Sequence, residues 1–174
     1  METQQNDLKS TMITYGLILG GITVVFQLML FFLEMHYQQT PAVGIVSLII
    51  MIGLLVFAFI QYKKLNEGYI SLSEAIKIGL GISLISALIG VVYSLILTNV
   101  LDPDTMQKTL DFTFDKMRAE NPEMPQNEIN NAREMSKKFT SPMISSAFQI
   151  IGALFIGFII SLIGGLIVKK SRPE

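Results

Sequence analysis

The sequence predicts an all-α membrane protein, a bundle of four transmembrane helices with an extramembrane helical hairpin between the third and fourth spans. Two observations support this prediction. First, residues 10–33, 35–62, 78–101 and 139–168 contain no Asp, Glu, Lys or Arg. Each run is longer than the roughly 20 helical residues that cross a hydrocarbon core of about 30 Å. Second, 16% of the 174 residues are charged, whereas a soluble domain carries about 25%.

We place the four spans at about residues 12–35, 42–62, 74–100 and 142–168. The first run is longer than the apolar region of a typical signal peptide and no small-residue cleavage site follows it, so we expect it to be retained as a span. Pro41 precedes the second span, and Lys63 and Lys64 follow it. The chain is therefore expected to form a single membrane domain over residues 1–174.

The third and fourth spans begin at recognisable helix-start signals. Ser71-Leu72-Ser73-Glu74 has the form of a capping box, in which a Ser hydroxyl and a Glu carboxylate bind free backbone N–H groups. Ser141-Pro142 has the form of an N-cap followed by proline at the first helical position. The cluster Lys169-Lys170-Ser171-Arg172 closes the fourth span on the polar side.

Residues 102–140 form the polar segment between the third and fourth spans. An apolar stripe at helical spacing begins after Asp102-Pro103 and runs through Met106, Leu110, Phe114 and Met117. Prolines at 122 and 125 end that helix, and a second one is predicted from about 126 to 139. Asp102 and Asp104 are expected to serve as helix-start charges. The resulting hairpin could pack on itself, lie on the membrane surface or receive a partner.

The distribution of Lys and Arg favours one orientation. With four spans, one side of the membrane carries seven of them: Lys9, Lys63, Lys64, Lys77, Lys169, Lys170 and Arg172. The other side carries six, spread through the hairpin: Lys108, Lys116, Arg118, Arg133, Lys137 and Lys138. The seven are concentrated in short segments next to the spans. By the positive-inside rule we expect both termini to be cytoplasmic and residues 102–140 to be periplasmic.

Small residues recur every four positions within the spans, a spacing that lets helices approach closely in a lipid environment. In the third and fourth spans these rows are longest, so we expect these two helices to pack against each other. A substrate passage lined by the serines of the same rows is the alternative. The residues expected at close helix contacts are Gly16, Gly20, Gly79, Ser83, Ala87, Gly90, Gln149, Ala153, Gly157, Ser161 and Gly165.

Polar chemistry inside the spans is sparse. Gln27 and Gln149 are the most polar interior side chains, and a Gln–Gln or Gln–Ser contact is expected, with ion coordination as the alternative. No interior acid or His is present, which argues against proton-coupled transport. Glu34 and His36 lie at the end of the first span. Because residues two apart on a helix point in different directions, we expect an interfacial polar cluster with Tyr37 rather than a metal site.

Composition excludes several functional classes. The net charge of −1 provides no basic surface for nucleic acid. The chain has no cysteine, which removes disulfides, thiolate metal sites and a Cys nucleophile. The nucleotide-binding loops and hydrolase or metalloprotease motifs are also missing from the sequence. We therefore expect no enzymatic activity, no cofactor and no bound metal.

Several segments together resemble one uncharacterised family. The first span opens with Tyr15-Gly16-Leu17-Ile18, and residues 59–71, Phe-Ile-Gln-Tyr-Lys-Lys-Leu-Asn-Glu-Gly-Tyr-Ile-Ser, lead into Ala75-Ile76-Lys77-Ile78-Gly79. Asp102-Pro103 and a Gly-rich last span ending in Lys169-Lys170 complete the pattern. The whole chain resembles domain-of-unknown-function family 4199 (DUF4199), small four-span proteins of Bacteroidota, and residues 61–79 are the most specific part. The resemblance implies an inner-membrane helical protein and supplies no activity.

Two functions follow from these observations. The first is a non-enzymatic component of the inner membrane or cell envelope, acting through helix packing and protein interaction, with the lipid bilayer, a second copy or an envelope protein as partner. The second is a small oligomeric carrier or channel for a neutral or lipid-like solute. A continuous groove lined by the serines and by Gln149 would indicate transport, and a tightly packed bundle would indicate the first function.

Overall fold

The computed structural model describes residues 2–139 and 141–171, and within these ranges the chain is all-helical. Thr140, in the predicted hairpin, and Arg172, in the cluster after the fourth span, lie outside the described residues. Besides the helices, one isolated β-bridge joins Ile70 and Lys170. The helices are α1 (Glu2–Phe32), α2 (Pro41–Leu65), α3 (Leu72–Ile96), the short π-helix η1 (Leu97–Leu101), α4 (Thr105–Glu120), α5 (Gln126–Lys138) and α6 (Pro142–Val168).

Four of these helical segments are long and apolar enough to cross a membrane: Asn6–Phe32, Pro41–Leu65, Leu72–Leu101 and Pro142–Val168. Large apolar side chains cover their outer surfaces, including Val25, Phe155 and Ile167. An outer surface this rich in large apolar side chains is suited to contact with lipid. The fold is compatible with a multi-pass membrane protein with four spans.

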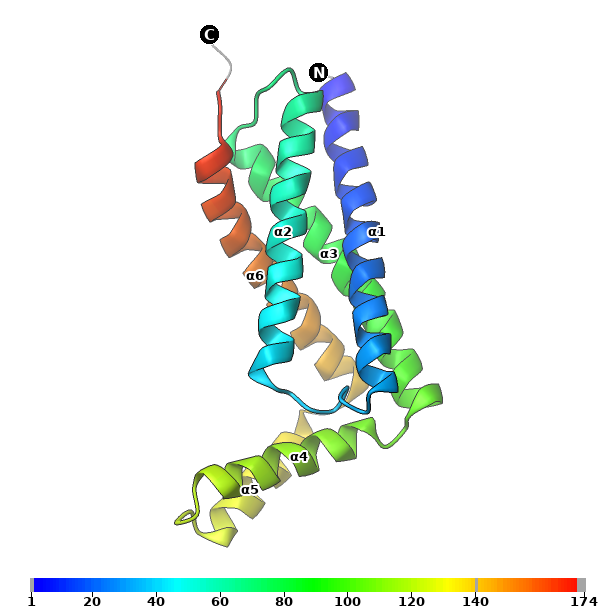
Figure 1. Ribbon diagram of the computed structural model, residues 1–174, viewed down its shortest axis with the longest axis vertical. Helices are drawn as coiled ribbons and strands as arrows, with labels where there is room; N and C mark the ends of the chain where they lie inside the picture. Colours follow the sequence, from blue (N-terminus) through cyan, green and yellow to red (C-terminus); the bar gives the residue numbers. More distant parts are fainter. Residues whose placement is uncertain (1, 140, 172–174) are drawn as a thin grey trace.

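Helix α3 is the centre of the bundle. It packs along α1 on one side and along α6 on the other, and α2 lies against α1, α6 and α3 with smaller contacts. Figure 1 shows that the start of α1 and the end of α6 lie at one end of the bundle, which we call the terminal end. Helices α4 and α5 lie beyond the other end, the α4 end, and extend sideways from the bundle (Figure 1).

The best-packed core lies in the terminal half of the bundle. Leu55, Phe59 and Tyr62 of α2 and Ile78 and Ile82 of α3 are fully buried in one cluster. At the α4 end the described helices contribute no side chain that is equally buried, and the cavities described below lie there. The bundle is therefore tight at the terminal end and hollowed at the α4 end.

Helices α4 and α5 share a small apolar cluster outside the four spans. Its buried members are Leu110 and Phe114 of α4 and Ile129 of α5. Polar contacts accompany it, since the guanidinium of Arg133 pairs with the Asp111 carboxylate and Arg118 donates to Gln126 Oε1 at 2.8 Å. These contacts hold the two helices to each other.

Helix ends follow local chemistry, with one departure from the prediction. The capping box at Ser71 and Glu74 is confirmed, although α3 begins at Leu72 rather than at residue 74. The expectation that the first span continues to residue 35 is wrong, because α1 ends at Phe32. Glu34 adopts a left-handed conformation (φ 56°) and the Met35 N–H donates to the Leu30 carbonyl at 2.8 Å, which is a Schellman-type helix end.

Candidate functional site

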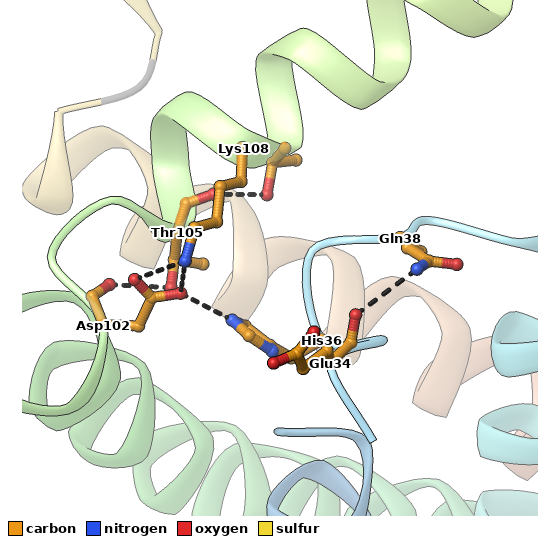
Figure 2. Close-up of polar contacts among 7 residues, drawn as sticks. Glu34, His36, Gln38, Asp102, Thr105 and Lys108 are labelled. Atoms are coloured by element: carbon orange, nitrogen blue, oxygen red, sulfur yellow. Dashed lines mark hydrogen bonds and ion pairs between the residues drawn. The ribbon is translucent and has the colours of Figure 1, made fainter. Parts of the chain in front are cut away.

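A polar contact at the α4 end joins two loops that are far apart in the sequence. His36 lies between α1 and α2, and its Nε2 is 2.9 Å from Oδ2 of Asp102, which lies between η1 and α4. Lys108, one turn into α4, donates to both carboxylate oxygens of Asp102 at 2.9 and 2.8 Å. Figure 2 shows the Asp102 carboxylate between the imidazole of His36 and the ammonium of Lys108. The cluster ties the α1–α2 loop to the start of α4.

This environment fixes the charge of Asp102. The hydrogen bond from Lys108 is the main cause that lowers its pKa to about 2, helped by the hydrogen bonds from His36 and Thr105 and opposed by partial burial. The same contact raises the pKa of Lys108. At neutral pH Asp102 is therefore a carboxylate and acts only as a hydrogen-bond acceptor.

The Asp102 carboxylate in turn selects the tautomer of a neutral His36 ring. Because the carboxylate can only accept, His36 Nε2 must donate to it. In the neutral imidazole this leaves Nδ1 as a lone-pair acceptor. Nδ1 is buried and has no hydrogen-bond partner among the described residues, and the whole side chain is only 5% exposed. The buried edge of the ring thus offers an unused acceptor.

His36 also lines a half-enclosed cavity of about 630 Å³, which we call the polar chamber. Helices α1, α3, α4 and α6 form its wall, with His36 and Gln39 from the α1–α2 loop. None of its described lining residues is an Asp, Glu, Lys or Arg. The polar side chains in the wall are Thr23, Gln27, His36, Gln39, Tyr93, Ser94, Thr98, Thr105, Thr109, Thr113, Ser145 and Gln149.

The threonines of the polar chamber present oxygen lone pairs rather than hydrogens. In α4 the hydroxyls of Thr105, Thr109 and Thr113 donate to backbone carbonyls of preceding residues at 2.7–2.8 Å. In η1 the hydroxyl of Thr98 donates to the Ser94 carbonyl at 2.9 Å. Each hydroxyl oxygen can still accept. With His36 Nδ1, the wall is rich in acceptors.

Tyr93 of α3 is the second lining residue with an unused polar atom. Its hydroxyl is buried and has no hydrogen-bond partner among the residues that the structure describes. Buried polar groups in folded proteins are hydrogen-bonded in the great majority of cases, so an orphan requires an explanation. The two residues that carry such atoms, His36 and Tyr93, line the same cavity.

A second, more open cavity of about 760 Å³ lies on the other side of His36. Its wall contains Asp102, Lys108, Asp111 and Asp115 together with Phe112. Within residues 2–139 and 141–171 no group of three or more His, Cys, Asp or Glu side chains is placed to hold a metal ion. Arg133 already occupies the Asp111 carboxylate. We therefore regard the polar chamber as the candidate site.

The structure places the expected packing residues of α3 and α6 opposite each other in reciprocal pairs. A Cβ added at Gly79 would overlap the Ser161 hydroxyl, and one added at Gly157 would overlap the Ser83 hydroxyl. Each serine donates to the glycine carbonyl four residues earlier in its own helix, Ser83 at 2.7 Å and Ser161 at 2.5 Å. These hydroxyls are therefore satisfied within the helix contact.

The other expected packing residues lie at three further contacts. Gly16 and Gly20 of α1 lie against Ile85 and Ile89 of α3. Gly165 lies against Ala75 and Leu72, since an added Cβ would be 2.8 Å from the Ala75 Cβ. Gly90 lies against the Gln149 amide, 2.6 Å from the position of an added Cβ. Ala87 is buried and Ala153 is partly buried.

Gln27 and Gln149, the interior amides noted in the sequence, come together as lining residues of the polar chamber. Sequence reasoning did not identify Tyr93 or the wall of α4. The available signal was the four-residue spacing of Thr105, Thr109 and Thr113, which places the three hydroxyls on one helical face.

The prediction for Glu34 and His36 is partly wrong. It assumes that both lie on a helix, whereas they lie in the turn after Phe32. The carboxylate beside His36 is that of Asp102, which is therefore more than a helix-start charge. The expected contact of His36 with Tyr37 is present, with ring centroids 5.3 Å apart.

The Asp102 contacts predict a pH dependence of stability. The pKa is about 2 in the folded protein and about 3.9 in an unfolded chain. The stabilisation is therefore complete above about pH 5 and is lost as the pH falls through 4 towards 2. We expect Asp102→Asn to lower the free energy of unfolding by about 1–2 kcal/mol at pH 7 and to reduce the loss of stability as the pH falls below about 5. Thermal unfolding in detergent between pH 3 and 7 measures this pH dependence, with Asp115→Asn as the charge-matched control. The same loss of stability at low pH in Asp102→Asn and in the unaltered protein would contradict the role of Asp102.

Comparison with known proteins identifies the family. The model of the family described as "Protein of unknown function (DUF4199)" matches residues 14–170, nearly the whole chain. No curated protein and no solved structure matches the chain. The matched region contains all four apolar segments in whole or in large part, together with every residue of the polar chamber. This chain belongs to the DUF4199 family of proteins of unknown function.

Proposed function

We propose that this protein is a non-enzymatic component of the inner membrane that binds an uncharged, hydroxyl-bearing ligand in the polar chamber. The observation that supports this most is that His36 and Tyr93, which carry the buried, unpartnered Nδ1 and hydroxyl, line one cavity. Leaving such a group unsatisfied costs about 1–3 kcal/mol. A ligand that hydrogen-bonds both atoms would recover that free energy on binding.

The composition of the wall supports an uncharged ligand. Its described residues include no Asp, Glu, Lys or Arg, and a charge placed without a counter-ion at membrane depth is costly. The hydroxyl oxygens of Thr98, Thr105 and Thr109 are acceptors, because their hydrogens bind backbone carbonyls. A ligand with several O–H donors complements this surface.

The packing supports binding at one end over passage through the bundle. Ser94 and Gln149 line the polar chamber. Ser83 and Ser161, in the terminal half, are at most 1% exposed and fill the space beside the glycines of the facing helix. A carrier or channel for a neutral solute, the alternative function, requires a route past these contacts. The described bundle offers a chamber open only in its α4 half.

The geometry of His36 supports a non-enzymatic role. An activated Ser, Thr or Tyr nucleophile needs its hydroxyl within hydrogen-bond reach of a base. The imidazole contacts Asp102 through Nε2, while Nδ1 has no partner among the described residues. No hydroxyl in the described wall is therefore paired with the only imidazole of the chain.

Orientation and partners form part of the same proposal. The termini face the cytoplasm and α4 and α5 form a periplasmic hairpin, supported by the Lys-rich segments around Lys63, Lys77 and Lys169 at the terminal end. The hairpin contributes Thr105, Thr109 and others to the chamber wall. Its outer surface is available to a second copy of the chain or to an envelope protein.

Native mass spectrometry of the whole chain, released from its own membranes, tests the proposal. We expect the unaltered protein to carry a bound molecule that the Ser94→Phe variant lacks, because the new ring fills the polar chamber. Leu84→Phe adds the same side chain nearly three turns away on α3, where Leu84 is exposed on the outer surface, and should retain the ligand. Absence of a bound mass, or equal retention by the two variants, would contradict ligand binding in the chamber.

A further inference from the structure

We propose that the ligand is an amphiphile: an uncharged lipid whose hydroxylated headgroup occupies the polar chamber while its acyl chain lies in an apolar groove between α1 and α3. This inference rests on the proposed function and adds the chemical class of the ligand and its route of entry. It is carried by the apolar groove, by the two lining residues that the groove shares with the chamber, and by the donor and acceptor pattern of the wall.

The apolar groove is a cavity of about 380 Å³ on the outer surface of the bundle. Val24 of α1 lines it together with Leu88, Ile89, Val92, Tyr93 and Ile96 of α3. Leu88 and Val92 are 48% and 57% exposed, and both lie within the membrane-spanning part of α3. The groove therefore opens towards the acyl chains of the surrounding lipid.

The groove and the polar chamber meet at two shared residues. Val24 and Tyr93 line both cavities. Tyr93 thus belongs to both walls, and its hydroxyl has no hydrogen-bond partner among the described residues. A molecule lying across the boundary has an apolar part in the groove and a polar part in the chamber. This is the distribution of polarity in a lipid.

The packing of α1 on α3 explains why the groove begins where it does. Gly16 and Gly20 bring the two helices together, with Ile85 and Ile89 filling the space that a larger side chain would need. One turn further along α1 stands Val24, where the groove opens. The groove therefore lies directly beyond the close glycine contacts, in the α4 half of the bundle.

The headgroup is identified by what the chamber wall can bind. His36 Nδ1 and the threonine oxygens accept hydrogen bonds, and the chamber volume of about 630 Å³ lies in the range of small-molecule sites. A glycerol or sugar headgroup supplies several O–H donors without a charge. A phosphate would bring a negative charge into a wall that, among the described residues, has no Lys or Arg to meet it.

Fluorescence quenching tests this directly, because the chain has no tryptophan. Leu88→Trp places one reporter at the groove. Ile151→Trp places another on the lipid-facing side of α6 at similar depth, since Gly90 of α3 lies against Gln149 of α6. The whole chain is reconstituted in phosphatidylcholine vesicles that contain a small fraction of brominated-chain monoacylglycerol. Matched vesicles contain the same fraction of brominated phosphatidylcholine.

We expect the monoacylglycerol to quench the Leu88→Trp reporter at least about fivefold more efficiently than brominated phosphatidylcholine does, and to show no such preference at Ile151→Trp. On the Leu88→Trp background, Tyr93→Phe removes the hydroxyl, and His36→Gln retains a donor for Asp102 while removing the Nδ1 acceptor. Each should bring the quenching preference towards parity, because losing one hydrogen bond lowers the affinity by up to about tenfold. Tyr15→Phe, outside both cavities, should leave it unchanged.

Two results would overturn the inference. One is equal quenching of the Leu88→Trp reporter by both brominated lipids. The other is displacement of the monoacylglycerol by an equal concentration of free glycerol, which would show that the acyl chain adds nothing to the affinity. If native mass spectrometry still finds a chamber ligand without an acyl chain, the proposed function stands and this inference alone fails. If Ser94→Phe and Leu84→Phe retain the same bound mass, the proposed function fails as well.

Discussion

Gly79→Ala should destabilise the bundle more than any other single methyl group added to α3 or α6. The new Cβ would overlap the Ser161 hydroxyl and lie 2.7 Å from the Ser161 Cβ, so α3 and α6 must separate. Overpacking of this kind costs about 1–3 kcal/mol. The reciprocal change Gly157→Ala should have a similar effect, because its Cβ would lie 2.8 Å from the Ser83 Cβ. Unfolding of the purified protein in mixed detergent micelles measures both changes.

Gly152 provides the matched control on α6. A Cβ there would have nothing within 4 Å, so Gly152→Ala should be neutral or slightly stabilising, since Ala favours helix over Gly. Combining Gly79→Ala with Ser161→Gly removes the overlapping side chain and should restore part of the lost stability. Equal unfolding free energies for Gly79→Ala and Gly152→Ala would show that the α3–α6 contact does not depend on the close approach of Gly79 to Ser161.

Glu74→Ala should have the second large effect, at the terminal end of the bundle. The carboxylate accepts hydrogen bonds of 2.7 Å from the Tyr62 hydroxyl, the Ser71 N–H and the Ser71 hydroxyl. Tyr62 is fully buried, and Ser71 caps α3. Losing the cap and the charged acceptor together should cost about 2–4 kcal/mol. Thermal unfolding with helix content followed by circular dichroism checks it.

Glu74→Gln separates the contributions, because its amide oxygen can still accept one of these hydrogen bonds and should give an intermediate loss. Ser73→Ala lies at an exposed position one residue away and should have little effect. A double-mutant cycle with Tyr62→Phe should give a coupling energy of about 1 kcal/mol. Full additivity of Tyr62→Phe and Glu74→Ala would exclude a direct contribution of the hydrogen bond between these residues.

The Glu74 contacts also give a physical meaning to the family resemblance. Residues 61–79, the most specific part of that resemblance, contain Tyr62, Asn66, Ser71 and Glu74, which are joined by hydrogen bonds at the terminal end. Nearby, Lys63 donates to the Val168 carbonyl at 2.8 Å. In this chain the segment therefore holds α2, α3 and α6 together, away from the polar chamber.

The parts of the fold that depend on local sequence could be predicted. Four uncharged runs identify the four apolar helices, because crossing a hydrocarbon core sets a minimum length. The capping box before α3 could also be predicted, because its two partners lie within four residues of each other in the sequence. The glycine and serine rows indicated that α3 and α6 pack closely, and these helices do so in the structure.

The candidate site could not be predicted in this way. His36 and Asp102 are 66 residues apart, and nothing in either loop specifies the other. The end of α1 depends on a left-handed conformation at Glu34, a residue type that does not usually mark a helix end. The polar chamber is lined by residues from several helices that are distant in the sequence, and hydrophobic periodicity within one helix does not report which helices meet around a cavity.

The uneven packing of the bundle has a consequence for its internal motion. The large side chains that are completely buried, among them Tyr62, Phe59 and Ile82, all belong to the terminal half. Local opening free energy rises with the number of such side chains, so backbone amides should exchange most slowly there and fastest around Ser94 and Gln27. We therefore expect the terminal half to be the least mobile part of the bundle, and slow fluctuations of the spans to be largest at the α4 end, where the chamber lies.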